Sequence, residues 1–145
     1  MLEMKKEAES ANADAFSSLR RMSADPRIHR EGLDQAAALA NGNQRVTNAL
    51  NVIAVHLNDQ RTRHPETIGR FNELSTQALL SMIHSQQSGH ASPNLDAALE
   101  SLESFRLPEI DPDHRDATHF REPWVFPQIS RIVTELSAMI LATKG

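Results

Sequence analysis

Apolar residues recur at three- and four-residue steps along nearly the whole chain of 145 residues, which is the period of one face of an α-helix. Such stripes are buried by packing helices together, so the pattern restricts the chain to all-α folds. The predicted helices cover residues 3–24, 27–58, 65–88, 93–105 and a last stretch with apolar positions between 129 and 140. The stripe of the first helix consists of Ala8, Ala11, Ala15, Phe16, Leu19 and Met22.

Prolines and glycines set the ends of these helices. Pro26 ends the first helix, because proline disfavours the helical conformation of the residue before it. Pro65 suits the first position of the third helix, and Gly89 suits a left-handed cap at its end. Gly42 interrupts the second stretch, but we expect one continuous helix there because the apolar residues keep their helical register across it.

The segment 107–122 differs from the rest, because it contains Pro108, Pro112 and several Asp and His residues, a composition typical of a solvated connector. The cluster Trp124-Val125-Phe126 precedes the last helix, and we expect Trp124 and Phe126 to plug the end of the bundle. Abundant Ala and Leu with only 4% aromatic residues also favour helices over a sheet. We therefore predict one domain, residues 1–145: an up-down bundle of four to five helices with a longer crossover, residues 107–122, before the last helix.

Charge and cysteine content exclude several classes of function. A net charge of −4 gives no basic surface for DNA or RNA, so we expect no nucleic-acid partner. The chain has no cysteine, which excludes disulfides, thiolate zinc sites and a cysteine nucleophile and permits a cytoplasmic location. No uncharged apolar run approaches the roughly 20 residues of a membrane-spanning helix, so we expect no span in this chain.

The densest group of potential metal ligands comprises Asp111, Asp113, His114, Asp116 and His119. Carboxylates and imidazoles at this density could bind a divalent metal. Their spacing matches no established ligand motif, so the favoured interpretation is a solvated connector without a metal.

The remaining histidines are scattered along the chain. His56 follows an apolar stretch and is expected to be half-buried, and an enzyme would require a polar pocket around His56 and His84. The sequence contains no nucleophile elbow, no glycine-rich phosphate loop and no Glu-x-x-His pair. We therefore expect no enzyme activity and assign no catalytic, cofactor-binding or metal-binding residue.

Four arginines, Arg20, Arg21, Arg27 and Arg30, surround the junction between the first two helices. Such a group could bind an anionic ligand, namely a phosphate, a lipid head group or a carboxylate. The favoured alternative is a solvated helix end paired with nearby acidic residues.

Two stretches, residues 7–26 and 43–57, resemble a known family. They are similar to the fusaric acid resistance and aromatic-acid exporter family, within it to the carboxy-terminal cytoplasmic region of YccS-like inner-membrane proteins. The matched positions are mostly packing residues: Asn12, Ala15, Phe16, Leu19, Met22, Pro26, Leu50 and His56. The later helices agree only in order and approximate length.

The resemblance implies a soluble cytoplasmic domain of a bacterial inner-membrane efflux permease for aromatic or related weak acids, with an assembly or regulatory role. The implied partners are the membrane portion of the same transporter or further copies of the chain. The chain departs from the family in lacking membrane helices, which implies an excised domain or a stand-alone relative. The alternative is a free-standing cytosolic helical bundle that binds a partner protein or a small ligand.

Overall fold

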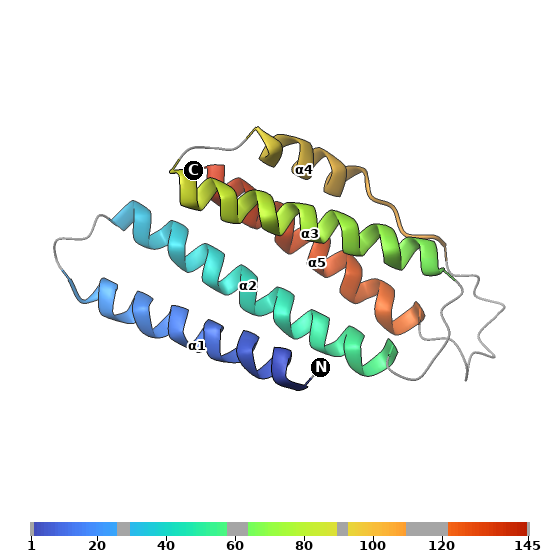
Figure 1. The fold of residues 1–145 in the computed structure, drawn as a ribbon, viewed down its shortest axis with the longest axis horizontal. Coiled ribbons are helices and arrows are strands. Elements are labelled where there is room, and N and C mark those ends of the chain that lie inside the picture. Colours follow the sequence, from blue (N-terminus) through green and yellow to red (C-terminus); the bar gives the residue numbers. More distant parts are fainter. Residues whose placement is uncertain (1, 26–29, 58–63, 90–92, 110–121, 145) are drawn as a thin grey trace.

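The chain forms five α-helices in the computed structural model, which describes residues 2–25, 30–57, 64–89, 93–109 and 122–144 and contains no strand among them. Each helix runs antiparallel to the one before it (Figure 1). The predicted all-α up-down bundle is therefore confirmed. Most of the predicted crossover, residues 107–122, lies outside the described residues. The helices are α1 (Leu2–Ser23), α2 (Arg30–Leu57), α3 (Pro65–Ser88), α4 (Asn94–Ser104) and α5 (Glu122–Lys144).

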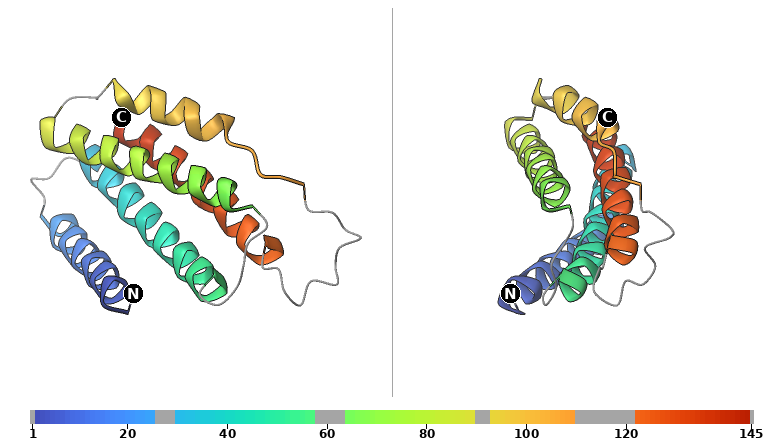
Figure 2. Two further views of the ribbon diagram at one scale, coloured as in Figure 1. Left: turned by 45° about the vertical axis from the view of Figure 1, so that its right-hand side comes forward. Right: turned by 90° about the vertical axis from the view of Figure 1, so that its right-hand side faces the viewer.

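Helix α5 forms the centre of the molecule. Among the described residues it packs against α2, α3 and α4, whereas α1 packs against α2 alone. Figure 2 shows α1 at one edge of the array and α4 at the other, with α2 and α5 between them. The core takes more of its side chains from α5 than from any other helix: Val125, Phe126, Ile129, Ile132, Leu136, Met139 and Ile140.

The predicted helix signals are confirmed at three positions. Pro65 opens α3, and Gly89 ends it with a φ of 67° while its N–H donates to the carbonyl of Ser85 at 3.1 Å. α2 is continuous through Gly42. A Cβ atom at Gly42 would lie 2.5 Å from Cγ of Met139, so the glycine permits the close approach of α2 and α5.

Two element boundaries differ from the prediction. α4 ends at Ser104, and Phe105 is extended with its ring centroid 6.3 Å from that of Phe71. Leu107 also packs against the core, so the connector begins as a packed segment and not as a solvated one. The Trp124-Val125-Phe126 cluster lies inside α5, because that helix already begins at Glu122.

The predicted stripes are partly wrong in α1. Among the described side chains of α1, only Asn12 is buried, while Ala11, Ala15 and Met22 are exposed. The reason is that α1 has a single neighbour, which covers one side of a helix that carries apolar residues over a wider arc. Leu50 on α2 and Ile83 on α3 continue the apolar spacing of their helices but are also exposed.

The segment Pro123–Lys144 is long and apolar enough to cross a membrane, judged by length and composition alone. The segment carries Arg131 and Glu135, so it is not an uncharged apolar run, and the expectation that this chain has no membrane span stays a prediction. The core helix of a water-soluble bundle passes the same test, and here the helix buries Ile129, Leu136 and Ile140 completely.

Candidate functional site

The predicted metal-binding candidates, Asp111 to His119, lie outside the described residues. Among the residues that the structure does describe, no group of three or more His, Asp or Glu side chains could hold a metal ion. The metal hypothesis for residues 111–119 therefore stays a hypothesis.

The structure separates His56 and His84, the two histidines around which an enzyme would require a polar pocket. His56 lies in the last turn of α2 and is half-buried, as predicted, whereas His84 is exposed near the end of α3. Because α2 and α3 run antiparallel, these two helix ends lie at opposite ends of the bundle (Figure 1). The two histidines therefore do not share the pocket that an enzyme would require, and the expectation of no enzyme activity stays a prediction.

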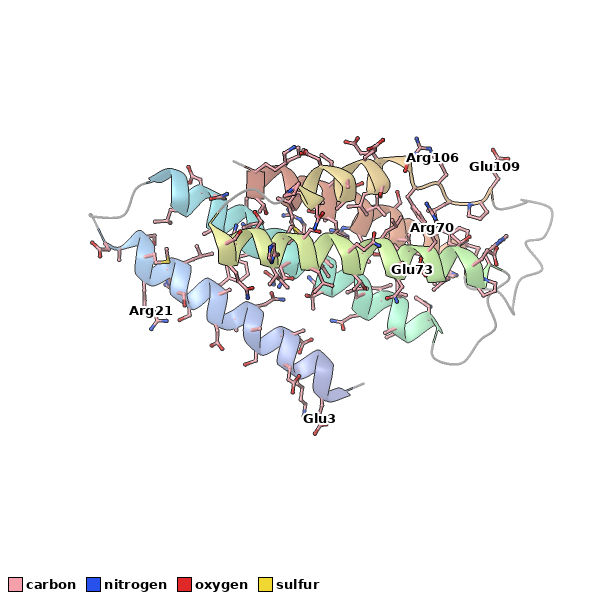
Figure 3. All side chains as sticks on the ribbon, turned by 45° about the horizontal axis from the view of Figure 1, so that its top comes forward. Glu3, Arg21, Arg70, Glu73, Arg106 and Glu109 are labelled. Carbon is pink, nitrogen blue, oxygen red and sulfur yellow. The ribbon has the colours of Figure 1, made fainter. Side chains whose placement is uncertain are left out.

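The arginine group is only partly described. Arg20 and Arg21 are exposed near the end of α1, and Nη2 of Arg21 donates to Oγ of Ser18 at 3.2 Å. Figure 3 shows Arg21 pointing away from the other helices. Arg27 and the side chain of Arg30 lie outside the described part of the chain, so the anion hypothesis stays a prediction.

An exposed apolar patch lies where α2 ends and α5 begins. Val52 and Val55, one turn apart on α2, are 39% and 75% exposed. Trp124, near the start of α5, is 61% exposed and stacks on His56, with the ring centroids 6.1 Å apart and 16° between the ring planes. We call these four residues the Trp124 patch. Exposed tryptophan and valine side chains at one end of a bundle are typical of a protein-interaction surface.

The contact between α2 and α5 positions the Trp124 patch. Nε of Arg45 donates to Oε1 of Glu135 at 2.7 Å. His56 follows Arg45 by eleven residues on α2, and Glu135 follows Trp124 by eleven residues on α5, so the ion pair and the stack lie in the same antiparallel register. They are about three helical turns apart. The buried side chains between them hold this register: Ala49, Ile53 and Ile132.

A second histidine contacts α5 at the same end of the bundle. His64 immediately precedes α3, and its ring centroid lies 5.9 Å from that of the buried Phe126, with 49° between the planes. Nδ1 of His64 is also 3.5 Å from Oε1 of Glu66. The first two turns of α5 are thus flanked by two imidazoles, His56 at the end of α2 and His64 just before α3.

Sequence reasoning assigned Trp124 and Phe126 the same role, and the structure separates them. Phe126 is buried as predicted, but Trp124 is not. Consecutive residues of a helix point about 100° apart. Counting back from Ile129 in steps of three and four places Val125 and Phe126 on the buried face and leaves Trp124 outside it. Extending the helical period of α5 to its first turn would therefore have identified the exposed tryptophan.

A shallow groove of about 350 Å³ lies between α3 and α4. Among the described residues that line it there is no Asp, Glu, His, Lys or Arg side chain. Its lining is polar at Gln77, Ser81, Asn94 and Ser101 and apolar at Leu80, Ala97 and Ala98.

A functional interpretation can therefore rest on the Trp124 patch and on the α3–α4 groove. The chain matches no protein-family model and no curated protein, and no solved structure matches it.

Proposed function

We propose that this chain is a helical interaction module that docks through the Trp124 patch. The observation that carries the proposal is the exposure of Trp124, which stacks on His56 at the end of α2 that also carries the exposed Val52 and Val55. A tryptophan fixed in this way loses little side-chain entropy when a partner covers it, and hot-spot tryptophans each contribute about 2 kcal/mol or more to binding.

The partner that we propose is the membrane portion of an inner-membrane efflux permease for aromatic or related weak acids, or a further copy of the chain. The resemblance of residues 7–26 and 43–57 to the exporter family supports this choice. The second of these stretches contains Val52, Val55 and His56, so the exposed patch and the resemblance coincide at the end of α2. The role would be in assembly or regulation.

Fractionation of cells from the source organism tests the proposed parent protein. An antibody raised against this chain should detect a large polypeptide in the membrane fraction. A soluble antigen near 16.1 kDa would contradict the exporter proposal.

A second experiment tests the surface itself. In the native antigen, Val55→Asp combined with Trp124→Ala should lower the assembled fraction seen by mass photometry, with a loss of affinity of about tenfold or more. Leu141→Asp is the matched control, because Leu141 is also an exposed apolar residue but lies near the opposite end of α5. Equal losses from both variants would contradict docking through the Trp124 patch.

The α3–α4 groove favours a second candidate, a free-standing cytosolic bundle that binds a small ligand. Its neutral polar lining of amides and hydroxyls suits an uncharged ligand with several hydrogen-bonding groups. Detection of the small soluble antigen would favour this candidate over the exporter domain.

A further inference from the structure

Helix α1 is set apart from the rest of the bundle by its contacts. Among the described residues it packs against α2 alone, and no α1 side chain belongs to the hydrophobic core or packs against it. Figures 1 and 2 show α1 at the edge of the molecule, with α2 between it and α5. The removal of α1 would therefore leave every core contact of α2, α3, α4 and α5 in place.

The centre of the α1–α2 contact is polar. Asn12 is only 6% exposed; its Nδ2 donates to Oγ1 of Thr47 at 3.3 Å, and its Oδ1 accepts from Nδ2 of Asn43 at 2.5 Å. The Thr47 hydroxyl in turn donates to the carbonyl of Asn43 at 2.9 Å. The apolar side chains that flank Asn12 on its own helix, Phe16 and Leu19 among them, are only half-buried.

Water can replace these hydrogen bonds when the two helices separate, because amides and hydroxyls bond to water nearly as well as to each other. Leu136 and Ile140 of α5, by contrast, are fully buried, and water cannot replace their apolar contacts. Separation of α1 from α2 is therefore much less costly than separation of α2 from α5.

We propose that α1 is a latch helix, which opens from α2 as a unit while α2, α3, α4 and α5 stay folded. Opening uncovers the face of α2 that carries Ala36, Ala40, Asn43 and Thr47 at helical spacing. The device is a conformational switch in the fold and does not depend on the partner proposed above.

Amide hydrogen exchange of the full chain, followed by mass spectrometry of peptides, tests the proposal. Amides in the middle of α1 should exchange about 100-fold faster than those around Leu136. Low urea should appreciably accelerate only the amides around Leu136, because their exchange requires an opening that exposes more surface. Exchange of both segments at one rate, with one urea dependence, would show that α1 opens only by global unfolding and would overturn the proposal.

Two sets of variants connect this exchange to the latch. Asn12→Ala should accelerate exchange in α1 by about fivefold and leave exchange in α5 unchanged, whereas Asn72→Ala, at an exposed position on α3, should change neither.

A disulfide provides the second test. Because the chain has no cysteine, Asn12→Cys with Thr47→Cys creates a single possible disulfide. Its formation should slow α1 to the rate of α2, and reduction should reverse the effect. Acceleration of α5 by Asn12→Ala would also overturn the proposal.

Discussion

Helix α2 forms two interfaces of opposite character, one with α5 and one with α1, which we call the α2–α5 seam and the α1–α2 seam. Towards α5 it buries Val46, Ala49 and Ile53, and Gly42 allows the backbones to approach closely. Towards α1 it presents Thr47 and other half-buried side chains to a helix whose buried residue is an asparagine. The α2–α5 seam resembles the interior of a domain, whereas the α1–α2 seam resembles a reversible contact. An amphipathic sequence thus specifies a helix without specifying how many neighbours cover it.

The largest expected difference between the seams is in the cost of removing a leucine. Leu136→Ala, at a residue with no exposed surface, should lower the free energy of unfolding by about 3–5 kcal/mol. Leu19→Ala, at a half-buried position on α1, should lower the free energy of unfolding by about 1 kcal/mol, because Leu19 buries less apolar surface. Urea unfolding measures both values. Similar costs would mean that the two seams do not differ as described.

A methyl group added at Gly42 probes the closeness of the α2–α5 seam. Gly42→Ala should lower stability by about 1–2 kcal/mol, because the clash with Met139 outweighs the gain in helix propensity. Gly69→Ala is the matched control: its Cβ would meet nothing within 4 Å on α3, so it should raise stability by about 0.5–1 kcal/mol. In a Met139→Ala background the cost of Gly42→Ala should disappear, and its persistence there would rule out the Met139 clash as its cause.

Truncation of Trp124 tests whether this residue, at the end of the α2–α5 seam, contributes to the stability of the core. Trp124→Ala should lower the free energy of unfolding by less than about 1 kcal/mol, since most of its side chain is exposed already. Phe126→Ala, two residues further along, should cost about 3–5 kcal/mol. Thermal unfolding followed by circular dichroism compares them, and equal losses would place Trp124 in the core after all.

The smallest expected effect belongs to the ion pair on the rim of the seam. Arg45→Met should cost about 0.5 kcal/mol at low salt and less at 1 M NaCl, because the Arg45 side chain is 46% exposed and its charge is screened. Arg20→Met on α1 provides the comparison, because Arg20 is exposed and no acidic residue lies three or four positions from it; its effect should be smaller and depend less on salt. A salt-independent loss at Arg45 would indicate that its aliphatic stem contributes through packing instead.

The sequence predicts where the helices lie along the chain but does not predict which helices pack against one another. Pro65 and Gly89 mark helix ends through local backbone chemistry, which acts whatever the tertiary contacts are. Burial depends on tertiary contacts, so the apolar pattern of α1 predicts neither the burial of Asn12 nor the exposure of Ala15. The Trp124–His56 stack joins residues far apart in the chain, and no local pattern encodes such a contact.

The most direct test of the difference between the two seams is the thermal unfolding of residues 25–145, without α1, beside that of the full chain. We predict that the shortened chain keeps its helical circular dichroism and one cooperative transition, with a melting temperature lower by about 5 °C. A shortened chain that unfolds without a cooperative transition would contradict the account, because α1 would then be part of the core that holds α2 to α5 together.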